Sequence, residues 1–453
     1  MTGPRAASVV MTDAQTHPDQ ITVGIVADDL TGGGDSAVQF ARDGWRTRLA
    51  LTAPDGQPLG HGAVLAVVSD ARAQTDTVAR ADTGRAVDAL AESGANRLLL
   101  KIDSTMRGSA HAQIRGALDS WRTHYPTSFA VVCPAYPMMG RTVQHGRVLV
   151  NGQGVETTSV GTDPVTPVTT SRLGELLPGS THLVLGPGTP AAHAARLREA
   201  AQTVTGVVTV DATTDADLLA LAEAVALLGV DAVPAGSAGL AVALSRVWCP
   251  DLADAAQHPR AAAERVVVVV SSLHDMSRSQ YAHLLAGTPT EHVRTFAPSL
   301  AVLLEPGAIA GWIEAELHAA PELPAVVVVA TPSERPEASV TDTPTAAVII
   351  ADGLATVTAA VFAHRAVGAV VLMGGEGARA VLDRFEASAI RVTAAIREGI
   401  PVGLIEGGRA DGLTVVTKAG GFGVTSSIAD ILPELLADHV LSLPASPTPG
   451  VHL

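Results

Sequence analysis

The sequence is poor in cysteine, in aromatic residues and in positive charge. Its two cysteines, Cys133 and Cys249, form neither a disulfide framework nor a zinc-binding spacing, so a reducing cytoplasm is the simplest expected compartment. Aromatic residues make up only 3% of the 453 residues. With 30 Lys and Arg against 45 Asp and Glu, the net charge is -15, which argues against a nucleic acid or an anionic membrane as a partner.

Long apolar runs and targeting signals are also missing. We see no run of about 18 apolar residues, so we expect no membrane-spanning segment. Residues 1–20 are polar and lack the apolar centre of a secretory signal. We expect residues 1–20 to be a disordered tail, and residues 441–453, which contain three prolines, to be a second one.

Alanine and valine dominate what remains, and short β-branched runs alternate with alanine-rich stretches. Such alternation predicts an α/β protein with mainly parallel sheets covered on both faces. The expected helices include residues 82–93, 191–202 and 215–228. The expected strands are residues 21–27, 64–68, 97–102, 129–133, 183–185, 207–210, 266–270, 326–329, 347–350, 370–373, 401–404 and 414–417.

One break divides the chain. Residues 247–264 carry two prolines and several acids between one α/β series and the next. We therefore expect two doubly wound domains, residues 21–246 and 265–440, with a ligand-binding cleft between them.

The most informative segment is residues 23–38, VGIVADDLTGGGDSAV. An apolar strand runs into Asp28 and Asp29, and Thr31 and a glycine run beginning at Gly32 follow before an expected helix. This order is typical of a small-molecule site at the end of a strand, where glycines admit a ligand and acids bind hydroxyls or take a proton. The simpler interpretation is a tight turn, with Asp35 as a plain helix N-cap.

Two further strand ends carry polar side chains of the same kind. The segment KIDSTMRG presents Lys101, Asp103, Ser104 and Arg107, although Ser104 or Thr105 could equally be a helix N-cap. The segment VSDAR adds the pair Asp70 and Arg72. Because carboxyl ends of parallel strands meet at one edge of a sheet, we expect these groups to converge on one site.

A loop follows the fourth expected strand, in the segment CPAYPMMGRTVQHGRVLVNG. Prolines and glycines fix its shape, and Arg141 is its one strong anion-binding group. Residues 162–168 form another proline-containing loop that could close over a ligand. Residues 236–240, GSAGL, are expected to be a strand-to-helix turn.

In the second domain, three segments after strands could bind phosphate. They contain no G-x-x-x-x-G-K-[ST] motif, and no G-x-G-x-x-G fingerprint follows a strand, so neither a P-loop nor a dinucleotide-dependent oxidoreductase is favoured. Glycine-rich turns of this kind otherwise serve packing. The candidate nucleotide-binding residues are Ser271, Ser272, Gly374, Gly375, Glu376, Gly377, Lys418, Ala419, Gly420, Gly421, Phe422 and Gly423.

As an ordered set, these motifs resemble the four-carbon acid sugar kinases, a family that includes threonate and 3-oxo-tetronate kinases. The segments are ADDLTGGGDSAVQFA, KIDSTMRG, PAYPMMGRTVQHG, GTDPVTPV, AGSAGLA, MGGEGARAVL and VVTKAGGFG. The resemblance implies ATP-dependent phosphorylation of the terminal hydroxyl of a four-carbon sugar acid. It implies the sugar acid on the N-terminal domain and ATP with Mg²⁺ on the C-terminal domain.

The resemblance also assigns roles. Arg107, with Arg72, is expected to hold the substrate carboxylate, while Asp28 and Asp29 bind hydroxyls and one of them serves as general base. Thr31, Gly32, Asp70, Lys101, Asp103, Ser104 and Arg141 complete the expected substrate site. We expect a sugar acid and ATP as the small-molecule partners, and a homodimer is possible on this sequence.

Two departures from the family pattern lie in the nucleotide turns. The family's Gly-Ser stands here as Ser271-Ser272, and its T-G-G-D-T-A stands as residues 373–378, MGGEGA. They leave open a second function, that of a non-catalytic, two-lobed sensor that binds a sugar acid without turning over ATP.

Overall fold

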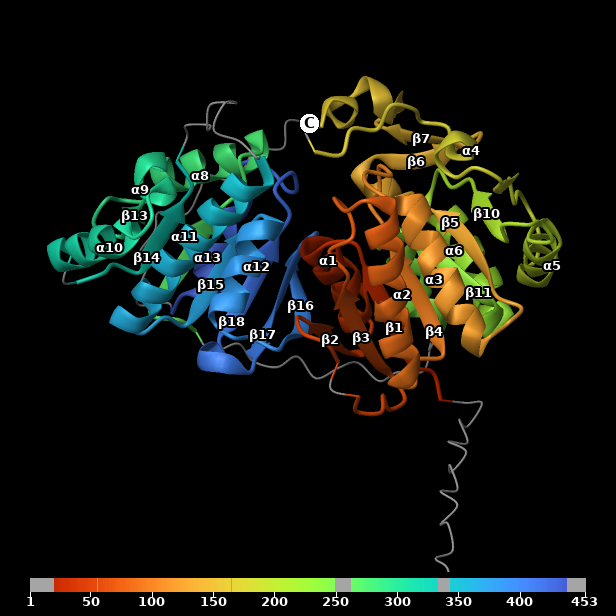
Figure 1. Ribbon diagram of the computed structural model, residues 1–453, viewed down its shortest axis with the longest axis horizontal. Helices are drawn as coiled ribbons and strands as arrows, with labels where there is room; N and C mark the ends of the chain where they lie inside the picture. Colours follow the sequence, from red (N-terminus) through yellow and green to blue (C-terminus); the bar gives the residue numbers. More distant parts are fainter. Residues whose placement is uncertain are drawn as a thin grey trace, which may run out of the picture.

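The computed structural model describes residues 20–54, 56–163, 165–248, 262–320, 322–332 and 343–437 (Figure 1). A single 15-stranded sheet runs through both domains in the order β13-β14-β12-β15-β18-β17-β16-β2-β3-β1-β4-β11-β5-β10-β9. Most neighbouring strands are parallel, and helices cover both faces. The predicted α/β class with mainly parallel sheets is therefore confirmed. Residues 1–19 of the first expected tail, all of the second and most of the expected linker lie outside the described residues.

The N-terminal domain supplies eight strands to this sheet and a small three-stranded sheet, β6-β7-β8. Its strands are β1 Val23–Ala27, β2 Arg46–Ala50, β3 Ala63–Val68, β4 Arg97–Lys101, β5 Phe129–Cys133, β6 Arg141–Gln144, β7 Arg147–Val150, β8 Gln153–Gly154, β9 Thr181–Leu183, β10 Val207–Val210 and β11 Ala232–Gly236. Its α-helices are α1 Leu30–Arg42, α2 Asp76–Glu92, α3 Ala110–His124, α4 Leu173–Leu176, α5 Pro190–Ala200, α6 Asp215–Leu228 and α7 Ala238–Trp248.

The C-terminal domain supplies the remaining seven strands. They are β12 Val266–Val270, β13 Val293–Phe296, β14 Val326–Ala330, β15 Ala369–Met373, β16 Ala389–Arg397, β17 Ile400–Glu406 and β18 Thr414–Lys418. Its α-helices are α8 Asp275–Gly287, α9 Leu300–Leu304, α10 Ala308–Ala319, α11 Thr343–His364, α12 Gly375–Arg384 and α13 Ser427–Leu435.

The two domains join edge to edge. Strand β16 pairs antiparallel with β2, with Ile390 opposite Leu49, so each domain covers the other's open sheet edge. Both β2 and β16 carry alternating polar residues and were missing from the predicted strands, as were β11 and β13. Strand β2 pairs with β3 on its other side, and β16 pairs with β17, so each of the two segments lies between two strands of the sheet.

Helix α1 lies at the junction of the domains, beside β2 and β16 (Figure 1). A Cβ on Gly33 would lie 3.1 Å from Leu49 and 3.2 Å from Ala27, against the N-terminal part of the sheet. A Cβ on Gly34 would lie 3.3 Å from Pro401 and from Thr417, against the C-terminal part. The absence of side chains at these positions lets both parts of the sheet approach the helix backbone.

The prediction of a strand at residues 347–350 is wrong, because this segment lies inside α11. Within α11, Ala346–His364 is also long and apolar enough to cross a membrane by length and composition, with a mean hydropathy of 2.0. The expectation that no such segment exists is therefore corrected. One face of α11 is packed in the core through Leu354, Val357 and Val361, and the ring of Phe362 lies 5.1 Å from that of Phe385 after α12.

This packing predicts that α11 stabilises the folded domain. Leu354 is 0% exposed, so Leu354→Ala should lower the free energy of unfolding by about 2–5 kcal/mol through lost burial and a residual cavity. Val348, on the same helix, is 66% exposed, so Val348→Ala should change it by less than about 0.5 kcal/mol. Denaturant unfolding of both variants makes the comparison, and equal small effects would show that α11 is not a core helix.

Candidate functional site

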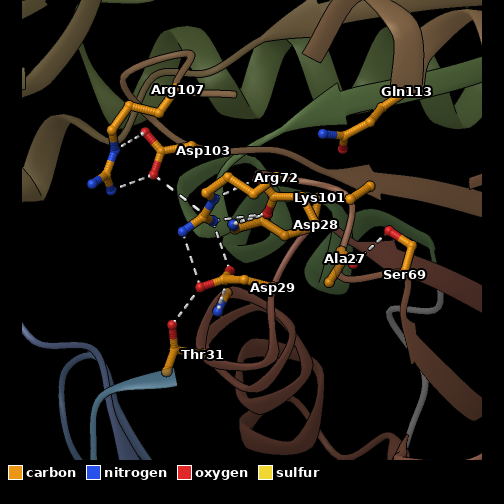
Figure 2. A network of polar contacts seen from close by, with 12 residues as sticks. Ala27, Asp28, Asp29, Thr31, Ser69, Arg72, Lys101, Asp103, Arg107 and Gln113 are labelled. Atoms are coloured by element: carbon orange, nitrogen blue, oxygen red, sulfur yellow. Dashed lines mark hydrogen bonds and ion pairs between the residues drawn. The ribbon is translucent and has the colours of Figure 1, made fainter. Parts of the chain in front are cut away.

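Charged side chains from three adjacent strand ends meet in the N-terminal domain (Figure 2). Strand β1 lies between β3 and β4, so the residues that follow each strand become neighbours. Asp28 and Asp29 follow β1, Arg72 lies in the loop after β3, and Lys101 ends β4. The three segments therefore lie together at one edge of the sheet, as predicted.

Arg72 holds both aspartates of the first segment. Its Nε and Nη2 donate to the two oxygens of Asp28 at 2.9 and 2.8 Å. Its Nη1 and Nη2 donate to the two oxygens of Asp29 at 3.0 and 2.7 Å. The Nζ of Lys101 lies 3.6 Å from Asp28, which is 1% exposed. A buried carboxylate pair is tolerated here because two cations face it.

Two glycines make this arrangement possible. Gly108 has φ +79°, and a Cβ there would collide with the carbonyl oxygen of Arg72. A Cβ on Gly32 would collide with the Lys101 ammonium group and with Asp29. The N-cap of α1 is Asp29, which accepts from the Gly32 N–H at 2.9 Å and from the Thr31 hydroxyl at 2.7 Å. Asp35, the alternative N-cap in the sequence, instead lies inside the helix.

A second ion-pair group continues from the first. Arg107 donates through Nη2 to Asp103 at 2.7 Å and through Nη1 to Asp163 at 3.2 Å. Asp103 also accepts from the backbone N–H and the hydroxyl of Thr105. Asp163 belongs to the proline-containing loop at residues 162–168, so this loop contacts the site. Sequence reasoning did not single out Asp163, and its place in that loop was the only available signal.

Electrostatics keeps these carboxylates ionised. Burial raises the pKa of Asp29, but Arg72, Lys101 and its hydrogen bonds outweigh that effect and leave the pKa below its usual value. Burial likewise opposes ionisation of Asp103, yet Arg107 and Arg72 hold its pKa well below the usual range. A carboxylate with a lowered pKa and filled acceptor sites is a poor proton acceptor, so this geometry argues against Asp29 as the general base.

Other predicted substrate-site residues lie around this group rather than in it. The Asp70 carboxylate is 3.5 Å from Arg379 of α12, an ion pair between the domains. Arg141 donates to the carbonyl of Met139, and burial leaves its pKa below the usual value despite the opposing effect of Asp103. Ser104 is partly buried, and the N-cap of α3 is Ser109, not Ser104 or Thr105.

Asp35 of α1 is a further acid beside the charged group. It is 8% exposed, and its Oδ1 has no hydrogen-bond partner among the described residues. Burial raises its pKa to about 7, against the opposing effect of Lys101. The sequence presented it as a plain helix N-cap, and only its burial at the junction distinguishes it.

In the C-terminal domain, the three predicted phosphate-binding segments also come together. They follow β12, β15 and β18, which are adjacent strands. Ser271 donates its hydroxyl to the carbonyl of Met373 at 2.8 Å, and Ser277 donates to Gly420 at 2.8 Å. Helix α12 begins after Gly374, which has φ +109° and provides no side-chain cap. The first N–H groups of α12 are thus left for an anion.

The side chain of Lys418, at the end of β18, is buried. It is 0% exposed, and its Nζ donates to the carbonyls of Ala419 at 2.7 Å and Gly420 at 3.3 Å. Burial lowers its pKa to about 8. The lysine therefore shapes the turn formed by residues 419–423. Within that turn, Gly423 has φ +81°, and Phe422 packs against Gly399 of the β16–β17 connection.

The two departures from the family pattern turn out to be neighbours. A Cβ on Gly377 would collide with the side chain of Ser271. The Ser271 side chain thus occupies the space that a side chain at residue 377 would need. Glycine at 377 compensates for serine at 271, and the helix still begins directly after the turn.

The two groups of residues adjoin across the domain junction. A Cβ on Gly375, at the start of α12, would lie 3.8 Å from the Thr31 methyl group. Nearby, the Tyr136 hydroxyl donates to Glu398 at 2.6 Å, and Arg42 donates to the same carboxylate at 2.9 Å. Polar contacts from the N-terminal domain therefore hold the β16–β17 connection, and the glycine turn faces the acidic strand end.

Comparison with known proteins agrees with this division. Residues 23–244 match the family model described as a sugar-binding N-terminal domain, and residues 267–428 match the one described as a nucleotide-binding C-terminal domain. A D-threonate kinase from Bordetella bronchiseptica is 43% identical over 88% of this chain and 94% of its own length. A 3-oxo-tetronate kinase from Cupriavidus necator is 27% identical over 91% and 97%. A solved structure from Salmonella typhimurium LT2 shares the fold, with 24% identity, 91% and 99% coverage and a TM-score of 0.75.

The packing of Ser271 against Gly377 predicts strong coupling between the two positions. Gly377→Thr alone should destabilise the C-terminal domain by about 1–3 kcal/mol through overpacking. Adding Ser271→Gly should restore most of that loss, a coupling free energy above about 0.5 kcal/mol. The free energies of unfolding of the wild type, the two single variants and the double variant together form the double-mutant cycle that tests this. Strictly additive effects would contradict the compensation.

Proposed function

The chain belongs to the four-carbon acid sugar kinase family, and we propose that it transfers the γ-phosphoryl group of ATP to the terminal hydroxyl of a four-carbon sugar acid. The observation that carries the proposal is the juxtaposition of Thr31, at the acidic strand end, with Gly375, at the start of α12. Threonate, erythronate and 3-oxo-tetronate are the candidate acceptors. The 43% identity with a D-threonate kinase makes threonate the first to test.

The substrate carboxylate would bind at Arg107. This guanidinium is 33% exposed, in contact with Asp103 and Asp163, and its planar donor fork suits a carboxylate. Arg72 and Lys101 lie deeper, where Arg72 pairs with Asp28 and Asp29 and Lys101 faces Asp28.

The nucleotide would bind at the turns after β12, β15 and β18. The uncapped N-terminus of α12 offers backbone N–H groups to the phosphates, and glycine at 374 leaves the backbone open. Glu376 in the first turn of α12 is exposed and is the residue that would hold Mg²⁺ together with the phosphates, since Mg²⁺ commonly takes one or two carboxylates. When bound, Mg²⁺ neutralises charge on the transferring phosphate.

The chemistry required of the protein is positioning and charge stabilisation. Arg107 orients the acceptor by its carboxylate, and the α12 N-terminus orients the phosphates toward it. Lys101 and Arg72 face the same point from the N-terminal side. A cytoplasmic location agrees with the use of ATP, and a homodimer stays a prediction.

A screen of ATP consumption with four-carbon sugar acids tests the function. We expect turnover with at least one of them and none without acceptor. A protein that is thermally stabilised by a sugar acid but consumes no ATP would instead be the two-lobed sensor.

The substrate assignment predicts a selective defect in Arg107→Lys. Loss of the guanidinium fork should raise KM for the sugar acid by about tenfold or more and change KM for ATP by less than about twofold. Arg85→Lys, at an ion pair whose arginine is 72% exposed, is the matched control and should behave as wild type. Normal sugar-acid binding together with lost ATP binding would reverse the domain assignment.

The nucleotide assignment predicts that Gly374→Ala loses ATP binding. The residue has φ +109°, and a Cβ would lie 2.7 Å from Ser271, so the turn must shift. ATP-induced thermal stabilisation, about 2.7 kcal/mol at a hundredfold excess over Kd, should disappear while stabilisation by sugar acid survives. Gly412→Ala controls for backbone strain, because Gly412 has φ +78° with open space around it at the other end of β18. Unchanged ATP binding in Gly374→Ala would leave the turn a packing feature only.

A further inference from the structure

Asp35 lies on the face of α1 that is directed toward both the charged strand ends of the N-terminal domain and the start of α12. Successive helix residues are about 100° apart, so Asp35 projects about 40° from Thr31 and between the directions of Thr31 and Gly32. The Thr31 side chain lies next to Gly375, at the start of α12. The Gly32 position faces the ammonium group of Lys101. Asp35 therefore lies one helical turn from Thr31, where the proposed sugar-acid and nucleotide sites adjoin.

The Asp35 carboxyl group is a buried acid with spare hydrogen-bonding capacity. Its Oδ1 has no partner among the described residues, although the side chain is more than nine-tenths buried. Its pKa is influenced by Lys101 at the neighbouring strand end, by Glu398 in the β16–β17 connection, and by Asp29 and Gln39 of α1 and its N-cap. The charge of Asp35 in turn affects Tyr136, in the loop after β5. Buried polar atoms normally have a partner, and an orphan at a substrate junction indicates a group reserved for a ligand.

The other acids of the site are already engaged. Asp28 and Asp29 each receive two donors from Arg72. Asp103 receives Arg107 and Thr105, and Asp163 receives Arg107 and two backbone N–H groups. Among Asp28, Asp29, Asp35, Asp103 and Asp163, only Asp35 has a buried carboxylate oxygen without a hydrogen-bond partner among the described residues.

We propose that Asp35 is a catalytic residue that accepts the proton of the attacking sugar-acid hydroxyl, an inference that rests on the proposed kinase function. The hydroxyl oxygen forms a bond to the γ-phosphorus of ATP, and the bond from that phosphorus to the bridging oxygen breaks. ADP leaves with that electron pair, and the proton of the hydroxyl passes to Asp35 Oδ1. Atoms and charge balance with the two substrates alone.

The acidity of Asp35 fits this role. Burial raises its pKa to about 7, so the group exchanges a proton readily near neutral pH. A raised pKa also carries a cost in stability. The folded state holds the proton more tightly than the unfolded state, so stability falls as pH rises from the unfolded value of 3.8 to about 7. Removing the charge should therefore stabilise the protein at neutral pH.

The test is Asp35→Asn in the full chain, with ATP and whichever four-carbon acid the wild type phosphorylates. We expect kcat to fall by about 100-fold or more, with KM for both substrates within about threefold of wild type. In the wild type, activity should rise with pH to a plateau above about 7, and this rise should vanish from the residual activity of the variant. The Tm of the variant should exceed that of wild type by an amount that grows between pH 4 and pH 7.

Asp43→Asn is the matched control. Asp43 ends the same helix, accepts from Ser245 at 2.5 Å and lies outside the site. It should keep wild-type kcat and pH dependence. A variant Asp35→Asn that retains kcat within about threefold, or that retains the wild-type pH rise, overturns the proposal while leaving the kinase function in place. A wild type that binds sugar acid but consumes no ATP overturns both.

Discussion

The structure depends on the close packing around helix α1. The N-terminal strands, the C-terminal strands and the buried Lys101 each contact a different side of it. The run Gly32–Gly34 in α1 removes side chains facing Lys101, the N-terminal strands and the C-terminal strands in turn. Glycine disfavours a helix by about 1 kcal/mol per residue, so this helix is held by its surroundings rather than by its own propensity. Larger side chains at these positions would push the domains apart and separate the acidic strand end from the glycine turn.

The charged network around Arg72 follows from the same closeness. Three parallel strands deliver two aspartates, an arginine and a lysine to one sheet edge, where water is scarce. Each charge is tolerated only because its partners are present, so the network is rigid and its carboxylates stay ionised. At Asp35, burial outweighs the effect of Lys101, whereas at Asp29 Arg72 and Lys101 outweigh burial. That difference in surroundings gives neighbouring aspartates on one helix opposite tendencies to hold a proton.

In the C-terminal domain, the residues of the glycine-rich turns pack against one another. The side chain of Ser271 fills the space beside Gly377, where a larger residue would collide with it. The start of α12 therefore packs closely against the residues that follow β12. Lys418 lies buried under the next turn and holds its carbonyls. Of the departures that the sequence presents, Ser271 and Gly377 are therefore in direct packing contact.

The sequence by itself determined the strands with continuous apolar runs, such as residues 266–270, because burial on both faces leaves a strong local signal. It also determined which strand ends carry acids, arginines and glycines, and hence the two halves of the site. Only the tertiary structure decided that β2 pairs with β16, that residues 347–350 lie in a helix and that Asp163 reaches Arg107. It alone decided that Asp29 caps α1 while Asp35 is buried without a partner. These outcomes depend on contacts between residues far apart in the chain, which set burial and charge environment and leave no trace in local pattern.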